Sequence, residues 1–248
     1  YGVGYSHIDL PSAQKLGICV TNTPDVLSDC TADIAMTLML MAARRAGEGE
    51  RELRAKKWGG WRPTHMIGAK VTGKTLGIIG FGRIGQAMAS RGHFGFGMKI
   101  KIFSRSQVSA ELLERYNAEQ FNSVETLLRK SDFVSLHCPG GTSNRHLINA
   151  SNLAQARPEL VLINTARGEV IDEVALANAL ENKTIKAAGL DVFDGEPNIN
   201  PNLMTAPNLV MLPHLGSATR ETREEMGFRA LANCRAFFEG ETPMDKVA

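Results

Sequence analysis

Three polar residues, Arg167, Glu196 and His214, lie in NTARGE (164–169), GLDVFDGEP (189–197) and LPHLGSAT (212–219), each next to an apolar run. Because ligands bind at the carboxyl ends of parallel strands, we expect the three side chains to converge there. An arginine binds a carboxylate and polarises a carbonyl, a histidine donates a proton, and a carboxylate favours the protonated imidazole. Taken singly, Arg167 could be a surface charge, Glu196 an acid in a turn and His214 an ordinary loop histidine. Together they suit hydride transfer to a 2-oxo acid.

A glycine-rich turn supplies the second chemical signal. The apolar stretch TLGIIG runs into GFGRIG (80–85), and a helical pattern follows. In such a turn Gly80 permits the tight bend, Gly82 lets the backbone approach a pyrophosphate, and Gly85 lets the helix sit close to the strand. The pattern alone also fits a turn packed for steric reasons. The strand before it, the helix after it and a second strand at the right distance favour a dinucleotide-binding site.

The end of that second strand indicates which dinucleotide is bound. A carboxylate for the ribose 2'-hydroxyl of NAD is expected about 20 residues beyond the glycines, but the chain has Ser104, Arg105 and Ser106 there. An arginine pairs with a phosphate, and the two hydroxyls can donate hydrogen bonds to it. We therefore predict that NADP(H) is preferred over NAD(H). The alternative is that Arg105 is a solvated surface residue.

Apolar runs that alternate with helical patterns must position these residues. Six short runs have the character of strands buried on both faces of a parallel sheet, namely 75–80, 99–103, 133–138, 160–165, 187–192 and 209–213. The alternation predicts an α/β fold with one doubly wound parallel sheet. Helices are predicted after the caps Ser109, Ser123 and Asp172, over about 29–57 after Ser28, and from 217 with Ser217 or Thr219 as the cap.

Composition bounds the possible partners. The chain has 248 residues, with 43% hydrophobic and 22% charged residues and a net charge of +2, which gives no reason to expect a nucleic acid or a membrane as partner. Its four cysteines form no CxxC pair, and its histidines lack metal-ligand spacing, so we expect reduced thiols in the cytoplasm and no metal. The chain starts at Tyr1, in what reads as a strand end and a turn, so we expect it to begin inside a domain.

Several motifs in order resemble the D-2-hydroxyacid dehydrogenase family: GVGYSHID, NTPDVLSDCTADIA, LGIIGFGRIGQ, NTARGEVID, GLDVFDGEP and PHLGSAT. ARRAGEGE, WGGWRP and GEPNIN further resemble its glyoxylate and hydroxypyruvate reductase, or glycerate dehydrogenase, branch. The resemblance implies a Rossmann coenzyme domain over 24–215. It also implies remnants of a second, flavodoxin-like substrate domain in 1–23 and 216–248, together with the linking C-terminal helix.

The resemblance also implies roles for single residues. Arg167, Glu196 and His214 would be catalytic, and the backbone N–H groups of Val3 and Gly4 would bind the substrate carboxylate. Trp61 resembles an aromatic residue that reaches the substrate pocket of a neighbouring subunit, which implies a homodimer; ordinary packing of a loop tryptophan is the alternative. The residues implied to line the cofactor are Phe81, Gly82, Arg83, Ile84, Ser104, Arg105, Cys138, Pro139, Thr142, Thr165, Ala166, Asp191 and Gly216.

The chain departs from the family pattern at Ser6, where many relatives have Asp, and at Asp25, where many have Gly. Residues 1–23 also provide less of a substrate lobe than the family has. The predicted activity is NADPH-dependent reduction of glyoxylate or hydroxypyruvate to a D-2-hydroxy acid. Two alternatives stay open: an NAD-linked glycerate dehydrogenase, and a dinucleotide-sensing binding protein like the corepressors that share this fold.

Overall fold

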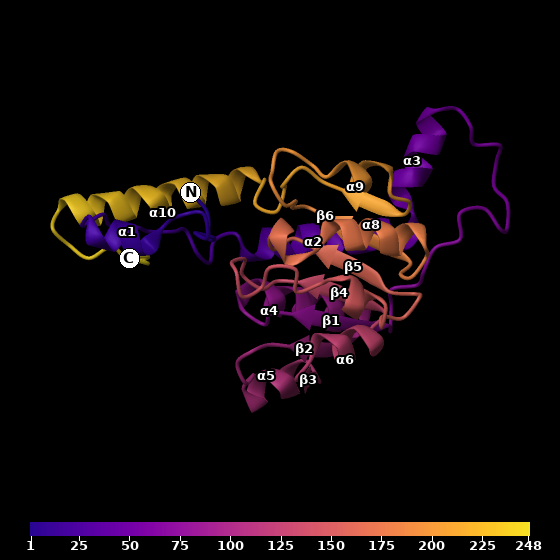
Figure 1. Ribbon diagram of the computed structural model, residues 1–248, viewed down its shortest axis with the longest axis horizontal. Coiled ribbons are helices and arrows are strands. Elements are labelled where there is room, and N and C mark those ends of the chain that lie inside the picture. Colours follow the sequence, from indigo (N-terminus) through magenta and orange to yellow (C-terminus); the bar gives the residue numbers. More distant parts are fainter.

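The computed structural model describes residues 1–248 and contains one parallel sheet of seven strands in the order β3-β2-β1-β4-β5-β6-β7 (Figure 1). The strands are β1 Thr75–Ile79, β2 Lys99–Phe103, β3 Glu119–Phe121, β4 Phe133–Leu136, β5 Val161–Asn164, β6 Ala187–Leu190 and β7 Leu209–Met211. The prediction of six strands missed β3. Its sequence, EQF, is short, mostly polar and at the sheet edge, so it carries no apolar signal.

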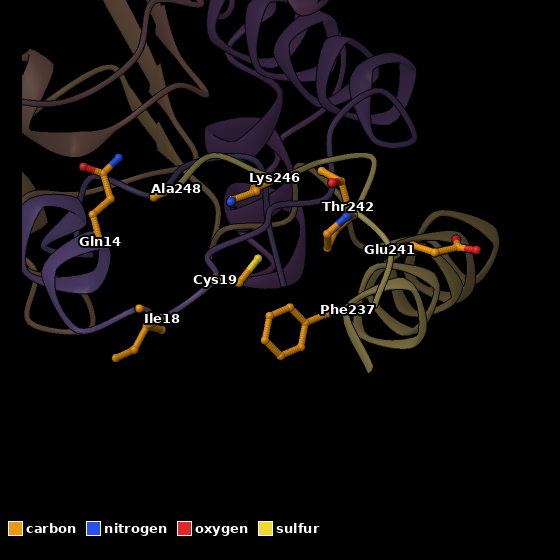
Figure 2. A pocket seen from close by; sticks show the side chains of 10 residues that line it. Gln14, Ile18, Cys19, Phe237, Glu241, Thr242, Lys246 and Ala248 are labelled. Atoms are coloured by element: carbon orange, nitrogen blue, oxygen red, sulfur yellow. The ribbon is translucent and has the colours of Figure 1, made fainter. Parts of the chain in front are cut away.

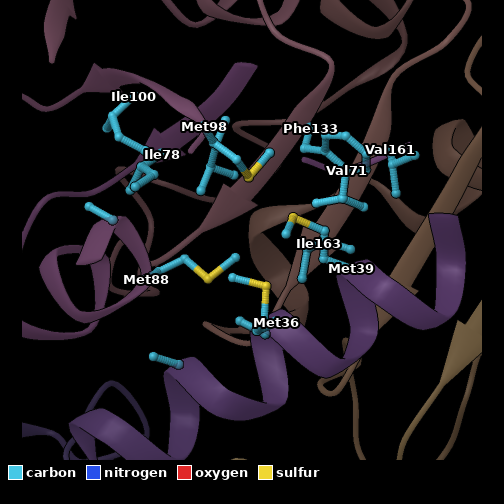
Figure 3. Close-up of a cluster of buried hydrophobic side chains, with 14 of the residues drawn as sticks. Met36, Met39, Val71, Ile78, Met88, Met98, Ile100, Phe133, Val161 and Ile163 are labelled. Atoms are coloured by element: carbon cyan, nitrogen blue, oxygen red, sulfur yellow. The ribbon is translucent and has the colours of Figure 1, made fainter. Parts of the chain in front are cut away.

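The sheet is covered on both faces, which confirms the doubly wound fold. Side chains alternate along a strand, so Ile78 of β1 points to one core and Ile79 to the other. Figure 3 shows the first core, where Met36 and Met39 of α2 and Met88 of α4 lie against the sheet. On this face are α2 Ser28–Arg44 and α4 Arg83–Ser90, and on the other are α6 Val124–Arg129, α7 Ala150–Leu153, α8 Glu173–Glu181 and α9 Pro201–Thr205.

Four predicted helix caps are confirmed. Ser109 caps α5 (Ala110–Arg115), Ser123 caps α6 and Asp172 caps α8, and in each case the side chain accepts a backbone N–H of the first turn. The long C-terminal helix, α10 (Arg220–Phe238), is capped by Thr219 rather than by Ser217. These bonds satisfy N–H groups that have no partner within the helix.

The single helix predicted over 29–57 is wrong in two respects. Ser28 lies inside α2, and Leu27 is the cap residue without a side-chain hydrogen bond. The helix also ends at Arg44, because Arg45 adopts a left-handed conformation with φ of 55°, and α3 (Ala46–Arg54) then starts in a new direction. Arg45 bonds Glu48 through two nitrogens, which favours the break.

Segments outside the sheet lie at opposite ends of the molecule. At one end α1 (Leu10–Lys15), α10 and both termini come together, and the backbone of Val20 bonds that of Ala248 (N···O 2.9 Å). At the other end α3 and the residues that follow it project from the sheet (Figure 1). None of the helices combines the length and the apolar character needed to cross a bilayer.

Candidate active site

The three glycines of the turn between β1 and α4 have different surroundings. Gly80 has φ of 90°, and a Cβ there would lie 2.6 Å from the backbone nitrogen of Cys138. A Cβ on Gly85 would lie 2.2 Å from the carbonyl oxygen of Gly80, so only glycine lets α4 sit this close to β1. Gly82 faces open space, with no atom within 4 Å of an added Cβ. The turn thus leaves room for a ligand at the amino end of α4, which favours anions.

Two members of the predicted trio, His214 and Glu196, are hydrogen-bonded to each other. His214 Nδ1 lies 2.8 Å from Glu196 Oε2, and the backbone N–H of Phe193 donates to Glu196 Oε1 (2.8 Å). The histidine side chain remains 52% exposed. Because Glu196 engages Nδ1, the Nε2 atom of the ring is the one left for a substrate.

Arg167 lies just after β5, next to the amino-terminal segment. Its Nη1 donates to the carbonyl of Ala166 (2.6 Å). A Cβ on Gly4 would lie 1.7 Å from Arg167 Nη2, so the guanidinium packs directly on the Gly4 backbone. Val3 is held by the Asn22 amide, which donates to its carbonyl (2.9 Å). The structure therefore brings the predicted carboxylate-binding segment to Arg167, although 163 residues separate Gly4 from it in sequence.

The turn that contains His214 is held by Asp191, a predicted cofactor-lining residue. Its carboxylate is 1% exposed and accepts the backbone N–H groups of Leu215 and Gly216 (2.7 Å each). Burial raises the pKa of this carboxyl group, and the two hydrogen bonds act against that rise. His214 itself has φ of 56°, a conformation that such a turn must hold in place. In the structure Asp191 thus orders the turn that contains His214.

Cys138 and Thr165 follow β4 and β5, at the carboxyl edge of the sheet. The Thr165 hydroxyl is buried and has no hydrogen-bond partner within the protein, which fits a site that a bound ligand completes. Burial raises the pKa of Cys138 to about 11, so its thiol is neutral. The neighbouring His137 is also neutral, because burial lowers its pKa to about 3. Neither group is therefore charged at neutral pH.

Other predicted cofactor-lining residues differ in whether their side chains are free to contact a ligand. The Phe81 side chain is buried against Tyr116, with ring centroids 5.9 Å apart, so only its backbone can meet a ligand. Arg83 forms an ion pair with Asp25. Ile84 packs against the first core. Pro139, Thr142 and Ala166 lie in loops after β4 and β5.

The predicted ribose-reading residues form an exposed loop after β2. Arg105 Nη1 lies 3.2 Å from the Ser143 hydroxyl, across the sheet edge. The Gln120 amide donates to the carbonyls of Ser104 (3.2 Å) and Ser106 (3.0 Å) and thereby fixes the loop. Sequence reasoning missed Gln120 because it lies in the unrecognised strand β3. It missed Ser143 because nothing local links residues 105 and 143.

Asn164 was missed as well, although it is a polar residue at the end of an apolar strand. It is 1% exposed, its amide donates to the Arg167 carbonyl (2.8 Å), and its oxygen accepts the Ala166 N–H (2.9 Å). Asn164 thus shapes the turn that presents Arg167.

Trp61 does not meet the trio within one subunit. It is 82% exposed and belongs to the segment after α3, at the opposite end of the molecule from α10 (Figure 1). A cavity of about 330 Å³ between residues 14–19 and 237–248, shown in Figure 2, contains none of the predicted site residues. The candidate site is therefore the sheet edge itself.

Comparisons with known proteins show which proteins this chain is similar to. The glyoxylate reductase of Thermococcus litoralis is 47% identical over 251 residues, covering 100% of this chain and 75% of the relative. The glycerate dehydrogenase of Hyphomicrobium methylovorum is 41% identical over 240 residues, covering 97% and 74%. The solved NADPH-dependent glyoxylate/hydroxypyruvate reductase of Sinorhizobium meliloti, in complex with NADP and malonate, matches with a TM-score of 0.91 and 36% identity, covering 100% and 76%.

The family model described as D-isomer specific 2-hydroxyacid dehydrogenase, NAD binding domain, matches residues 36–216. This range includes the glycine turn and all three residues of the trio. The chain belongs to the D-isomer specific 2-hydroxyacid dehydrogenase family.

Proposed function

We propose that this chain reduces small 2-oxo acids, glyoxylate and hydroxypyruvate, to D-2-hydroxy acids with a nicotinamide dinucleotide as the reductant. The observation that carries the proposal is the 2.8 Å pair of His214 and Glu196 at the sheet edge that holds the glycine turn. Relatives named glyoxylate reductase and glycerate dehydrogenase support this substrate class. Reduction of glyoxylate by the purified protein, followed by the loss of absorbance of the reduced nicotinamide, tests it.

In this proposal each residue of the trio has a separate task. Arg167 binds the substrate carboxylate together with the backbone N–H groups of Val3 and Gly4, and it polarises the carbonyl. His214 Nε2 donates a proton to the carbonyl oxygen, while Glu196 orients the ring and stabilises its positive charge. The bound cofactor supplies the hydride that the carbonyl carbon accepts. The substrate thus gains one hydride and one proton and becomes a hydroxy acid.

The cofactor would be held along the carboxyl edge of β1, β2 and β4–β6. The backbone of the glycine turn would face the pyrophosphate, and the Thr165 hydroxyl would gain a partner. We propose that residues 24–215 form this cofactor unit. Residues 1–23 and 216–248 would contribute to the substrate site.

We also propose that NADP(H) is preferred over NAD(H), because Arg105 lies between two serines and no carboxylate follows β2. The NADP-bound structural relative is consistent with this preference. NAD-linked glycerate dehydrogenase activity is the alternative, favoured by the relative of that name.

The Arg105→Ala substitution tests this cofactor preference. Because a charge-assisted hydrogen bond contributes about 1.5–3 kcal/mol, kcat/KM with NADPH should fall by about 10- to 150-fold, while kcat/KM with NADH changes little. Arg129→Ala removes an exposed arginine from the end of α6 and should leave both values unchanged. Equal losses with the two cofactors, or a wild-type preference for NADH, would remove the case for a phosphate-binding role.

We further propose a homodimer in which Trp61 reaches the substrate site of the partner. The arm formed by α3 and the residues after it exposes Leu53, Trp58, Trp61 and Ile67. Exposed apolar groups of this kind mark protein interfaces.

Trp61→Ala should raise KM for the 2-oxo acid by about tenfold without changing KM for the cofactor, since in the proposed dimer this side chain would be buried on the substrate side only. Phe94→Ala removes another exposed aromatic side chain outside the arm and serves as the control. Sedimentation should show a dimer. A monomer at micromolar concentration that still turns over would contradict this role for Trp61.

The cytoplasm is the compartment that we propose for the protein. All four cysteines are free thiols in the structure, as expected for a reducing environment.

A further inference from the structure

Glu173, the first residue of α8, is a buried carboxyl group to which no role in the reaction has been given. It is 7% exposed, and its Oε1 accepts the backbone N–H of Asp194 (2.8 Å). Burial raises the pKa of Glu173, the hydrogen bond from the Asp194 N–H acts against that rise, and the nearby charges of Asp194 and Glu196 add to it. A carboxyl group is costly to bury, so its place beneath this loop calls for a structural reason.

Helix capping is not that reason. Asp172 already caps α8, because its Oδ1 accepts the N–H groups of Val174 and Ala175 (3.1 Å each). The Glu173 carboxylate instead turns to a loop 21 residues further along the chain. Its distinctive contact is thus with that loop rather than with its own helix.

The loop bonded by Glu173 leads directly to the His214 pair. Asp194 follows Phe193, whose N–H donates to Glu196 Oε1 (2.8 Å), while Glu196 Oε2 meets His214 Nδ1 (2.8 Å). The backbone of residues 193 and 194 also packs closely against Gly168, where an added Cβ would lie 1.9 Å from the Phe193 carbonyl carbon. Residues 193 and 194 therefore connect the start of α8, the turn after Arg167 and the glutamate.

The outer side of the loop is held by one exposed ion pair. Arg145 Nη2 lies 2.8 Å from Asp194 Oδ2, and the Arg145 side chain is 48% exposed. Exposed pairs contribute little, commonly below about 1 kcal/mol. The part-buried hydrogen bond that the Asp194 N–H donates to the Glu173 carboxylate is therefore the stronger of the two restraints.

We propose that Glu173 is a positioning residue for the proton-transfer pair: by holding the Asp194 N–H, it fixes the loop so that the Phe193 N–H orients Glu196 toward His214. The inference rests on the proposed function for its effect on turnover. The bond to Asp194 can be measured without turnover.

Glu173→Ala, Glu173→Gln and Glu173→Asp, made in the full chain, test the proposal. Alanine leaves the Asp194 N–H without its acceptor, so kcat should fall about tenfold or more, with KM for the cofactor unchanged. Glutamine keeps an acceptor oxygen of the same reach and should restore most of kcat. Aspartate is one methylene shorter, should behave like alanine, and carries the test if the alanine variant does not fold. Glu181→Gln, at the exposed end of the same helix, should have no effect.

Amide hydrogen exchange at Asp194 provides the independent readout. Exchange should be about tenfold faster in the alanine and aspartate variants and close to wild type in the glutamine variant. If the wild type reduces no 2-oxo acid, the proposed function fails, while the exchange pattern still decides whether Glu173 fixes the loop. Wild-type kcat and wild-type Asp194 protection in Glu173→Ala would overturn the positioning role. A glutamine variant as impaired as alanine would overturn it as well.

Discussion

Replacement of His214 by alanine is expected to lower kcat for glyoxylate reduction by about 10²- to 10⁴-fold, the usual contribution of a positioned general acid. Nε2 is the ring atom that Glu196 leaves free, and its loss removes the proposed proton donor. Cofactor binding should persist, because the glycine turn follows β1 and the loop of residues 104–106 follows β2, whereas His214 follows β7. Rapid-mix kinetics and a cofactor titration of the same sample would separate the two effects.

The backbone of His214 requires a matched control. With φ of 56° this position disfavours alanine for reasons unrelated to proton transfer. His214→Asn tolerates the left-handed conformation and cannot act as an acid, so it should be as inactive as alanine but closer to wild type in stability. His93→Ala removes a histidine outside the site and should remain active. Near-normal turnover by the asparagine variant would refute the role of His214.

Arg167→Lys is expected to lower kcat/KM for the 2-oxo acid by about 10²- to 10³-fold, although the positive charge is kept. The guanidinium donates to the Ala166 carbonyl through Nη1 and packs on Gly4 through Nη2. A lysine has one donor centre on a flexible stem and cannot reproduce both contacts while it binds a carboxylate. Steady-state kinetics with glyoxylate and hydroxypyruvate measure the loss.

Two additions make the arginine experiment specific. Arg157→Lys changes an arginine that pairs with Asp132 (3.2 Å) away from the site and should leave kcat/KM unchanged. Added guanidinium ion should partly restore turnover in Arg167→Ala, since the small cation can occupy the space left by the side chain. A lysine variant with wild-type kcat/KM would show that charge alone is sufficient and that the fork geometry is not used.

The strands were predictable where their sequences form continuous apolar runs, and β7 was found in this way although it is an edge strand and only partly buried. Strands such as β4 and β5 are buried along their whole length and appear in the sequence as continuous apolar runs. β3 lies at the edge, where the sheet does not require apolar side chains, and so it left no such run. The break at Arg45 was missed because a left-handed residue other than glycine has no reliable local signal.

The candidate site also has features that were predictable from the sequence and features that were not. The glycine turn, most of the helix caps and the placement of Arg167, Glu196 and His214 at one sheet edge were predictable, because they depend on local residue types and on the rule that parallel strands end together. Three contacts are visible only in the folded chain: Gly4 lies on Arg167, Ser143 meets Arg105, and Glu173 accepts the Asp194 N–H in the loop before Glu196. Each of these contacts joins segments that are 21 or more residues apart, and its geometry depends on how whole elements pack rather than on any local pattern.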